Sequence, residues 1–202
     1  MALSHTILAV LANSPCSGYD IGKRFEEGVS CFWKASQQQI YRELGKMEKQ
    51  GLAHPEIIPQ DGKPDKKIYH ITPEGKAELL HWFAEPSEPT PIREDLLVKV
   101  LAGSHVPIEM LRQEVLSRRQ LHEQKLKHYL EKEQLFLTLP QTEDSSERPI
   151  CLQGEFRYLT LRRGIRYEQN WIEWCDEVLA FLSEKENESK INSKFKIINS
   201  KF

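Results

Sequence analysis

The sequence lacks the features of a membrane or secreted protein. It contains no run of eighteen apolar residues, the length that a membrane-spanning helix needs. The N-terminal stretch MALSHTILAVLANS has neither the basic leader nor the small-residue cleavage site of a signal peptide. We therefore expect a cytoplasmic protein without a membrane partner, and a hydrophobic content of 39% is sufficient for a buried core.

Catalytic and metal-binding patterns are missing as well. The sequence has no HExxH, no GxSxG, no P-loop and no glycine-rich dinucleotide turn, so we expect neither an enzyme nor a cofactor. The cysteines form no CxxC pair, have no histidine at zinc-site spacing and are predicted to be free, buried thiols. They are Cys16, Cys31, Cys151 and Cys175. The formal net charge of −2 argues only weakly against a nucleic-acid partner, because a local basic surface is what contacts phosphate.

A proline-rich stretch, EPSEPTP at residues 85–91, divides the chain, because a helix cannot continue through its three prolines. The sequence before it has a mixed pattern of helices and a hairpin, predicted as one domain over residues 1–86. The sequence after it is predicted as a helical domain over residues 91–186. Its helices are expected at roughly 92–104, 107–138 and 149–186. Residues 187–202 contain INSKF twice and no helical apolar stripe, so we expect a flexible tail there.

The second predicted helix begins just after NSPCSG, with Ser17 or Gly18 as its cap. Its buried side is predicted to carry Ile21, Phe25 and Val29. Tyr19 and Asp20 lie in the first turn, where free backbone N–H groups favour an anion such as a phosphate. Tyr19 is therefore a candidate DNA contact, and a partly buried aromatic side chain is the alternative interpretation.

The third predicted helix, residues 36–50, has two unlike faces. Ser36 followed by Gln39 is a capping box at its start, and Gly51 ends it. The core face is predicted to carry Ile40, Leu44 and Met47. The opposite face is predicted to carry Gln38, Tyr41, Arg42, Lys46 and Lys49. Glutamine can pair with adenine, arginine with guanine, and tyrosine or lysine with phosphate. This face, with Ser36 and Gln37 beside it, is predicted to bind the DNA major groove, and an ordinary solvated surface is the alternative.

A β-hairpin is predicted next, because LAHPEIIP and KKIYHIT are rich in strand-forming residues and are joined by the turn sequence QDGKPD. Pro55 marks an edge strand. The basic tip of the hairpin, within residues 59–67, is expected to contact phosphates through Lys63, Lys66 and Lys67. Thr72 caps a further helix. This order of elements predicts a mainly α protein with an N-terminal winged helix-turn-helix domain and a hairpin wing.

The C-terminal domain is predicted to form long, coiled-coil-like helices. One apolar stripe consists of Leu111, Val115, His122, Leu126, Tyr129 and Phe136. A second consists of Leu152, Phe156, Leu159, Tyr167, Trp174, Val178 and Phe181. The two helices could close on each other within one chain, but stripes this long expose more apolar surface than a monomer usually tolerates. We therefore expect a homodimer, and its two-fold axis would match an inverted-repeat operator.

Four segments carry a family resemblance: SGYDI, FWKASQQQIYRELGKMEKQGL, GKPDKKIYHITPEGK and YLTLRRGIRYEQNWIEWCDEVL. They resemble the PadR transcriptional regulators, specifically the branch of AphA-type virulence activators, over nearly the whole chain. The resemblance implies a winged domain that binds an inverted-repeat operator as a dimer and long C-terminal helices that form the dimer. It leaves open which genes are controlled and whether they are repressed or activated.

Two other functions stay open at this point. One is a winged-helix adaptor that binds protein through the same helix. The other is a small-molecule-binding protein whose aromatic dimer interface is the functional site. An unidentified effector could bind between Trp33, Trp82, Trp171 and Trp174. Core packing is the more common role of aromatic residues at helical spacing.

Overall fold

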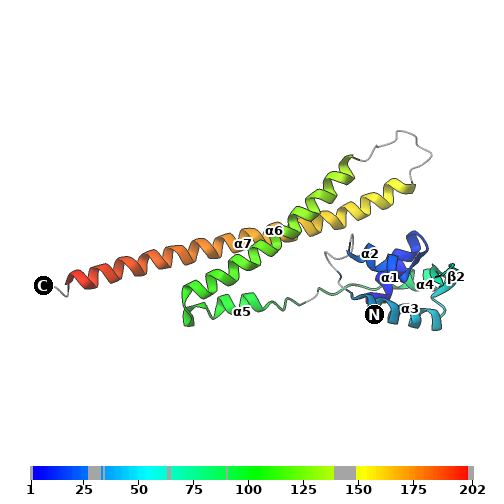
Figure 1. Cartoon of the computed structure of the whole chain (residues 1–202), viewed down its shortest axis with the longest axis horizontal. Helices are drawn as coiled ribbons and strands as arrows, with labels where there is room; N and C mark the ends of the chain where they lie inside the picture. The colour runs from blue at the N-terminus through cyan, green and yellow to red at the C-terminus, as the bar shows by residue number, and fades with distance from the viewer. Residues whose placement is uncertain are drawn as a thin grey trace. The chain divides into compact units, whose positions relative to one another are not determined.

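The chain forms two compact units, residues 1–90 and 91–202, and the division falls within EPSEPTP. The computed structural model describes residues 2–26, 33, 35–62, 65–89, 91–138 and 149–199. The first unit contains α1 (Ala2–Asn13), β1 (Cys16–Ser17), α2 (Gly18–Arg24), α3 (Gln37–Lys49), β2 (Ala53–Ile58), β3 (Lys66–Ile71) and α4 (Pro73–Ala84). The second contains α5 (Asp95–Leu101), a 3-10 turn (Gly103–His105), α6 (Ile108–Thr138) and α7 (Pro149–Asn199) (Figure 1).

The first unit has one apolar core formed by α1, α2, α3 and the sheet. Its fully buried side chains include Ile7, Leu8, Ile21, Ile40, Leu44 and Met47. The predicted core face of α3 is thereby confirmed, since its apolar residues repeat at helical spacing and are all buried. Phe25 is also buried as expected, and Val29 lies outside the described residues.

The hairpin wing is confirmed, and it belongs to a three-stranded antiparallel sheet with the order β1, β3, β2. The third strand, β1, was not expected, because two residues are too few for a strand pattern and NSPCSG resembles a turn. In β1, Cys16 pairs with Tyr69 and Ser17 with Ile68. Pro55 lies in β2 at the edge of the sheet, as expected from the sequence.

Helix α4 begins against the chain that follows α3. The Thr72 hydroxyl accepts the Gly75 N–H at 2.9 Å, which confirms the predicted cap, and donates to the Gly51 carbonyl at 2.6 Å. The backbone approach is close here: a Cβ atom on Gly75 would lie 2.1 Å from the Leu52 carbonyl oxygen. Glycine is therefore required at position 75 for steric reasons.

Gly75→Ala is expected to lower the free energy of unfolding of the first unit by about 1–3 kcal/mol, because the backbone of residue 52 must move. Gly45→Ala is the matched control, since a Cβ on Gly45 would meet nothing within 4 Å. Because alanine is the better helix former, this control is expected to stabilise α3 by about 0.5–1 kcal/mol. Urea unfolding of both variants measures the difference. Equal effects of the two substitutions would contradict the steric argument.

In the second unit, α6 and α7 pack side by side in antiparallel directions, with α5 against α6 (Figure 1). Four residues of the stripe predicted for α6 are buried, Leu111, Val115, His122 and Tyr129, and the other two, Leu126 and Phe136, are half-buried. Five of the seven residues in the stripe predicted for α7 are exposed, and the other two, Trp174 and Val178, pack against the core of this unit. The buried α7 residues are Ile165, Glu168, Cys175 and Leu182. The exposed ones include Leu152, Phe156, Leu159, Tyr167 and Phe181. Helix α7 therefore carries apolar residues on two sides.

A polar pair is enclosed between α6 and α7. The Nδ1 atom of His122 contacts the carboxylate of Glu168, and the two residues are only 4% and 3% exposed. The His122 ring stacks on Trp171, with ring centroids 5.0 Å apart. Its Nε2 atom has no hydrogen-bond partner in the described part of the chain. The pair therefore depends on a single polar contact inside an apolar seam.

Helix α7 also continues beyond its predicted end. The structure is helical up to Asn199, whereas the sequence predicted the last helix to end near residue 186. No proline or glycine follows Gly164, and Lys185 forms an ion pair with Glu188 one turn later at 2.8 Å. The tail has no apolar stripe, but nothing in its sequence ends the helix. No helix of the described residues is long and apolar enough to cross a membrane.

The two cysteines whose side chains are described are buried free thiols, as predicted. Burial raises the pKa of Cys16 and of Cys175 above the ordinary thiol value, so neither is a reactive thiolate at neutral pH. The side chains of Cys31 and Cys151 lie outside the described residues.

Candidate nucleic-acid interface

The interface is built on α3, whose start is fixed by the predicted capping box. The Ser36 hydroxyl accepts the Gln39 backbone N–H at 3.3 Å, and the Gln39 side-chain oxygen accepts the Ser36 N–H at 2.8 Å. The Gln39 side chain is therefore held at the helix end. The capping box fixes the first turn of α3, and the exposed residues that follow it therefore extend from a helix with a defined start.

The exposed face of α3 is the one predicted from the sequence. It carries Gln38, Tyr41, Arg42, Lys46 and Lys49. Lys46 forms an ion pair with Glu43 at 2.9 Å, which offsets part of its charge. Gln38 and Arg42 lie one turn apart, and neither side chain is bonded to another group in the described ranges of the chain. Their donors and acceptors are thus available to a partner molecule.

Gln37, unlike Gln38, has a side chain that is bonded within the protein. Its Nε2 atom donates to the carbonyl of Gly18 at 2.8 Å, which ties the first turn of α3 to α2. This amide donor is engaged within the protein, and the contact of Gln37 with DNA stays a prediction. No sequence pattern indicated this bond, because its partner is a backbone atom nineteen residues away.

Tyr19 lies in the first turn of α2 and is 67% exposed, so its interpretation as a partly buried aromatic is wrong. Ser17 caps this helix in a second capping box, with the Asp20 N–H donating to its hydroxyl at 3.1 Å. The same hydroxyl donates to the Asp20 carboxylate at 2.7 Å. That carboxylate already occupies the helix end where an external anion was expected, so the phosphate contact predicted there would have to use the Tyr19 side chain.

The wing brings its basic residues to the same region. Lys66 begins β3, and its Nζ atom lies 3.5 Å from the Asp20 carboxylate, so the wing is linked to the first turn of α2. Lys67, the second residue of β3, is exposed. Lys63 lies outside the described residues. Lys67 is therefore the wing lysine with the most accessible charge in the described chain.

The Ser17 hydroxyl, and to a lesser extent Lys66, lower the pKa of Asp20 below its ordinary value of 3.8. A carboxyl group with a lowered folded-state pKa stabilises the fold above its unfolded-state pKa, and this contribution is lost as the pH falls through the folded-state value. We expect Asp20→Asn to flatten the loss of stability on acidification below about pH 4, because asparagine keeps the acceptor oxygen without the charge. Urea unfolding of parent and variant at a series of pH values measures this difference. If the stability of the parent and of Asp20→Asn falls equally with decreasing pH, Asp20 does not contribute to the pH dependence of stability.

The outer face of the wing holds a histidine pair that the sequence did not indicate. His54 and His70 are cross-strand partners whose rings stack with centroids 5.0 Å apart. The His70 Nε2 atom also pairs with the Glu56 carboxylate at 2.9 Å. Only the strand register brings these residues together, so the sequence spacing carried no signal for them.

The four tryptophans considered as an effector site each have packing contacts inside their own unit. In the first unit, Trp33 packs against the core and Trp82 stacks on His5 with centroids 4.8 Å apart. In the second, Trp171 packs against the His122 ring, and Trp174 meets Trp171 edge to face. Within each unit the described tryptophans serve packing.

Comparison with known proteins matches both units. The family of PadR-like transcriptional regulators matches residues 7–81, and the virulence activator α C-terminal family matches residues 92–183. A probable transcriptional regulator of Mycobacterium tuberculosis is 36% identical over 195 residues, covering 92% of this chain and 100% of the relative.

Two solved structures are similar along most of the chain. The virulence activator AphA of Vibrio cholerae is 35% identical with a TM-score of 0.71, covering 91% of this chain and 99% of its own. PadR of Bacillus subtilis in complex with operator DNA is 26% identical with a TM-score of 0.74, covering 90% of this chain and 99% of its own. The Bacillus subtilis protein has also been crystallised with p-coumaric acid.

Proposed function

Because the chain belongs to the PadR-like family of transcriptional regulators, we propose that it binds an inverted-repeat operator in double-stranded DNA as a homodimer. The observation that carries this proposal is the exposed face of α3, where Gln38 and Arg42 stand free of bonds to the described chain. The opposite face of the same helix is buried in the core. A helix held in this way can enter the major groove without unfolding any part of the domain. We also propose a cytoplasmic location.

The residues of this surface have two roles in the proposal. Gln38 and Arg42 contact base edges, because an amide and a guanidinium can each form two hydrogen bonds with a purine. The remaining residues contact the phosphate backbone and set the position of the domain on the duplex. They are Tyr19, Ser36, Tyr41, Lys46, Lys63, Lys66 and Lys67.

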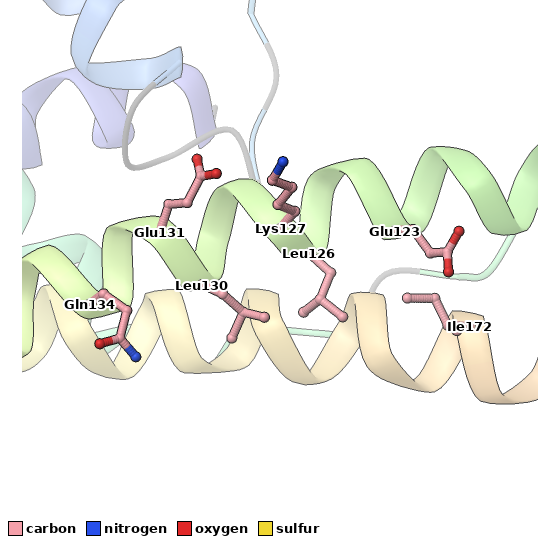
Figure 2. A pocket seen from close by; sticks show the side chains of 7 residues that line it. All are labelled: Glu123, Leu126, Lys127, Leu130, Glu131, Gln134 and Ile172. Atoms are coloured by element: carbon pink, nitrogen blue, oxygen red, sulfur yellow. The ribbon is translucent and has the colours of Figure 1, made fainter.

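The second copy is proposed to cover the apolar side of the C-terminal helices that α6 and α7 leave open. On α7 this side includes Leu152, Phe156 and Leu159, which are all more than half exposed. An open groove of about 540 Å³ lies along α6 beside Ile172 of α7, with Leu126 and Leu130 on its floor (Figure 2). Its rim is formed by Glu123, Lys127, Glu131 and Gln134. Apolar surface bordered by charges of both signs suits a self-complementary partner.

Control by a small molecule is a further part of the proposal, and its support is the relative crystallised with p-coumaric acid.

The proposed function is tested by selecting duplexes from a random library with the full-length protein, while light scattering measures its mass. We expect a dimer at micromolar concentration and a selected sequence with two inverted half-sites. A monomer that binds a single half-site tightly would contradict the dimer. A library without enrichment would contradict sequence-specific binding.

A further inference from the structure

Two glycines make a notch in α2 where α3 approaches it. Gly18 and Gly22 lie one turn apart and are both buried. A Cβ atom on Gly18 would lie 2.5 Å from Cε1 of Tyr41, and one on Gly22 would lie 2.1 Å from Oε1 of Gln37. Both distances are shorter than any van der Waals contact, so a methyl group at either position would displace the side chain of Tyr41 or Gln37 from its place against α2.

Gln37 fills the notch with both ends of its amide. Its Nε2 atom donates to the Gly18 carbonyl at 2.8 Å, while its Oε1 atom rests against Gly22. Gln37 is also the first residue of α3, directly after the Ser36 cap. Tyr41, one turn later, packs on Gly18. The contact between the two helices on this side thus combines one directional hydrogen bond with one aromatic contact.

We propose that Gln37 is a positioning residue for sequence recognition: it fixes the rotation and axial position of α3 on α2, and thereby aims Gln38 and Arg42 at the bases. The inference rests on the proposed DNA-binding function and removes Gln37 from its set of direct contacts. Apolar core contacts are not directional, so they tolerate small rotations of a helix. A pair of hydrogen bonds to a base edge does not tolerate such a rotation, because the strength of each bond falls steeply with misalignment. The hydrogen bond from Gln37 of α3 to the Gly18 carbonyl of α2 is directional, so it can fix the rotation of α3.

A double-mutant cycle between the notch and its occupant tests this role. Gln37→Ala, Gly22→Ala and the double variant are made in the full chain. Affinity is measured for a duplex selected by the parent protein and for a random duplex. We expect each single substitution to lower the ratio of selected to random affinity by about tenfold, because either one abolishes the same hydrogen bond. The double variant should lose no more than one single variant, since the added methyl group occupies the space that Gln37 has left.

Two additional variants sharpen the test. Gln37→Met keeps the length of the side chain without the donor, and it should lower the ratio as Gln37→Ala does. If Gly22→Ala fails to fold, Gln37→Met still tests whether the hydrogen bond of Gln37 is needed for sequence recognition. Lys67→Ala in the wing shares no bond with the notch. Lys67→Ala should therefore lower the affinity for both duplexes by the same factor, whether or not Gly22→Ala is also present. The ratio of selected to random affinity should not change when Lys67→Ala is added.

Three results would overturn the inference. If the effects of Gly22→Ala and Gln37→Ala on the ratio multiply, Gln37 acts independently of the notch, as a direct DNA contact would. If Gln37→Ala and Gln37→Met leave the ratio of a selected duplex unchanged, α3 is aimed without this bond, and only the positioning role fails. If the parent protein selects no duplex at all, the proposed function fails and the positioning role fails with it.

Discussion

The full-length Arg42→Ala variant is expected to lose about 1–3 kcal/mol of binding free energy per half-site on its selected duplex, or about 2–6 kcal/mol for a dimer on both half-sites. Arg42 lies on the exposed face of α3, and its guanidinium is bonded to no other group in the described chain. Its fork of donors matches the two acceptors that guanine presents in the major groove. A random duplex offers this pairing only by chance, so its affinity should fall much less.

Lys67→Ala is the matched comparison for Arg42→Ala. Lys67 is exposed on the wing, where phosphate is the nearer partner. We expect this substitution to weaken selected and random duplexes alike and to reduce the salt dependence by about one unit of slope for each phosphate that the lysine no longer neutralises. Lys66 is the less suitable choice, because its ion pair with Asp20 changes as well. Titrations at several salt concentrations separate the two roles. If Arg42→Ala lowers both affinities equally while Lys67→Ala changes sequence preference, the two roles are reversed.

His122→Leu is expected to lower the free energy of unfolding of the C-terminal unit by about 3–5 kcal/mol. The carboxylate of Glu168 is 3% exposed and contacts the His122 ring. Removing the imidazole leaves this carboxylate buried in an apolar seam without its partner. The cost of an unpaired buried charge exceeds that of the missing packing, because water cannot reach the group.

The double variant His122→Leu/Glu168→Leu is the control for this effect. Two apolar residues of similar size should pack against Trp171 and restore stability to near the parent value, because no charge is then buried. Urea unfolding followed by helical circular dichroism measures the cycle, since α6 and α7 contribute most of the helix. If the double variant is as unstable as His122→Leu, the pair does not act through its charge.

The features predicted most accurately from the sequence are those set by neighbouring residues. Both the cap at Ser36 and the cap at Thr72 were predicted, because a capping side chain bonds a backbone group three residues away. The buried face of α3 followed from residues three or four positions apart. The winged fold, the PadR family and the regulatory function were then correctly inferred from the order of these elements and from four longer matching segments.

The features that were missed depend on pairings between distant segments. Helix α7 has apolar residues on two sides, and helical periodicity cannot tell which side its own α6 will cover. The bond from Gln37 to Gly18 depends on how closely two backbones approach, and no side-chain pattern encodes that distance. The two residues of β1 form a strand only because β3 lies beside them. The DNA contacts themselves stay predictions.

The short strand β1 has a consequence for the entropy of DNA binding. Ser17 is at once a sheet partner of Ile68 and the cap of α2, and the neighbouring Lys66 is paired with Asp20 in the same helix turn. The base of the wing is therefore ordered before any duplex arrives. A wing that was free to move would lose about 1–2 kcal/mol for each residue immobilised on DNA. Because β1 has already restricted this part of the chain, more of the energy of each phosphate contact is retained as affinity.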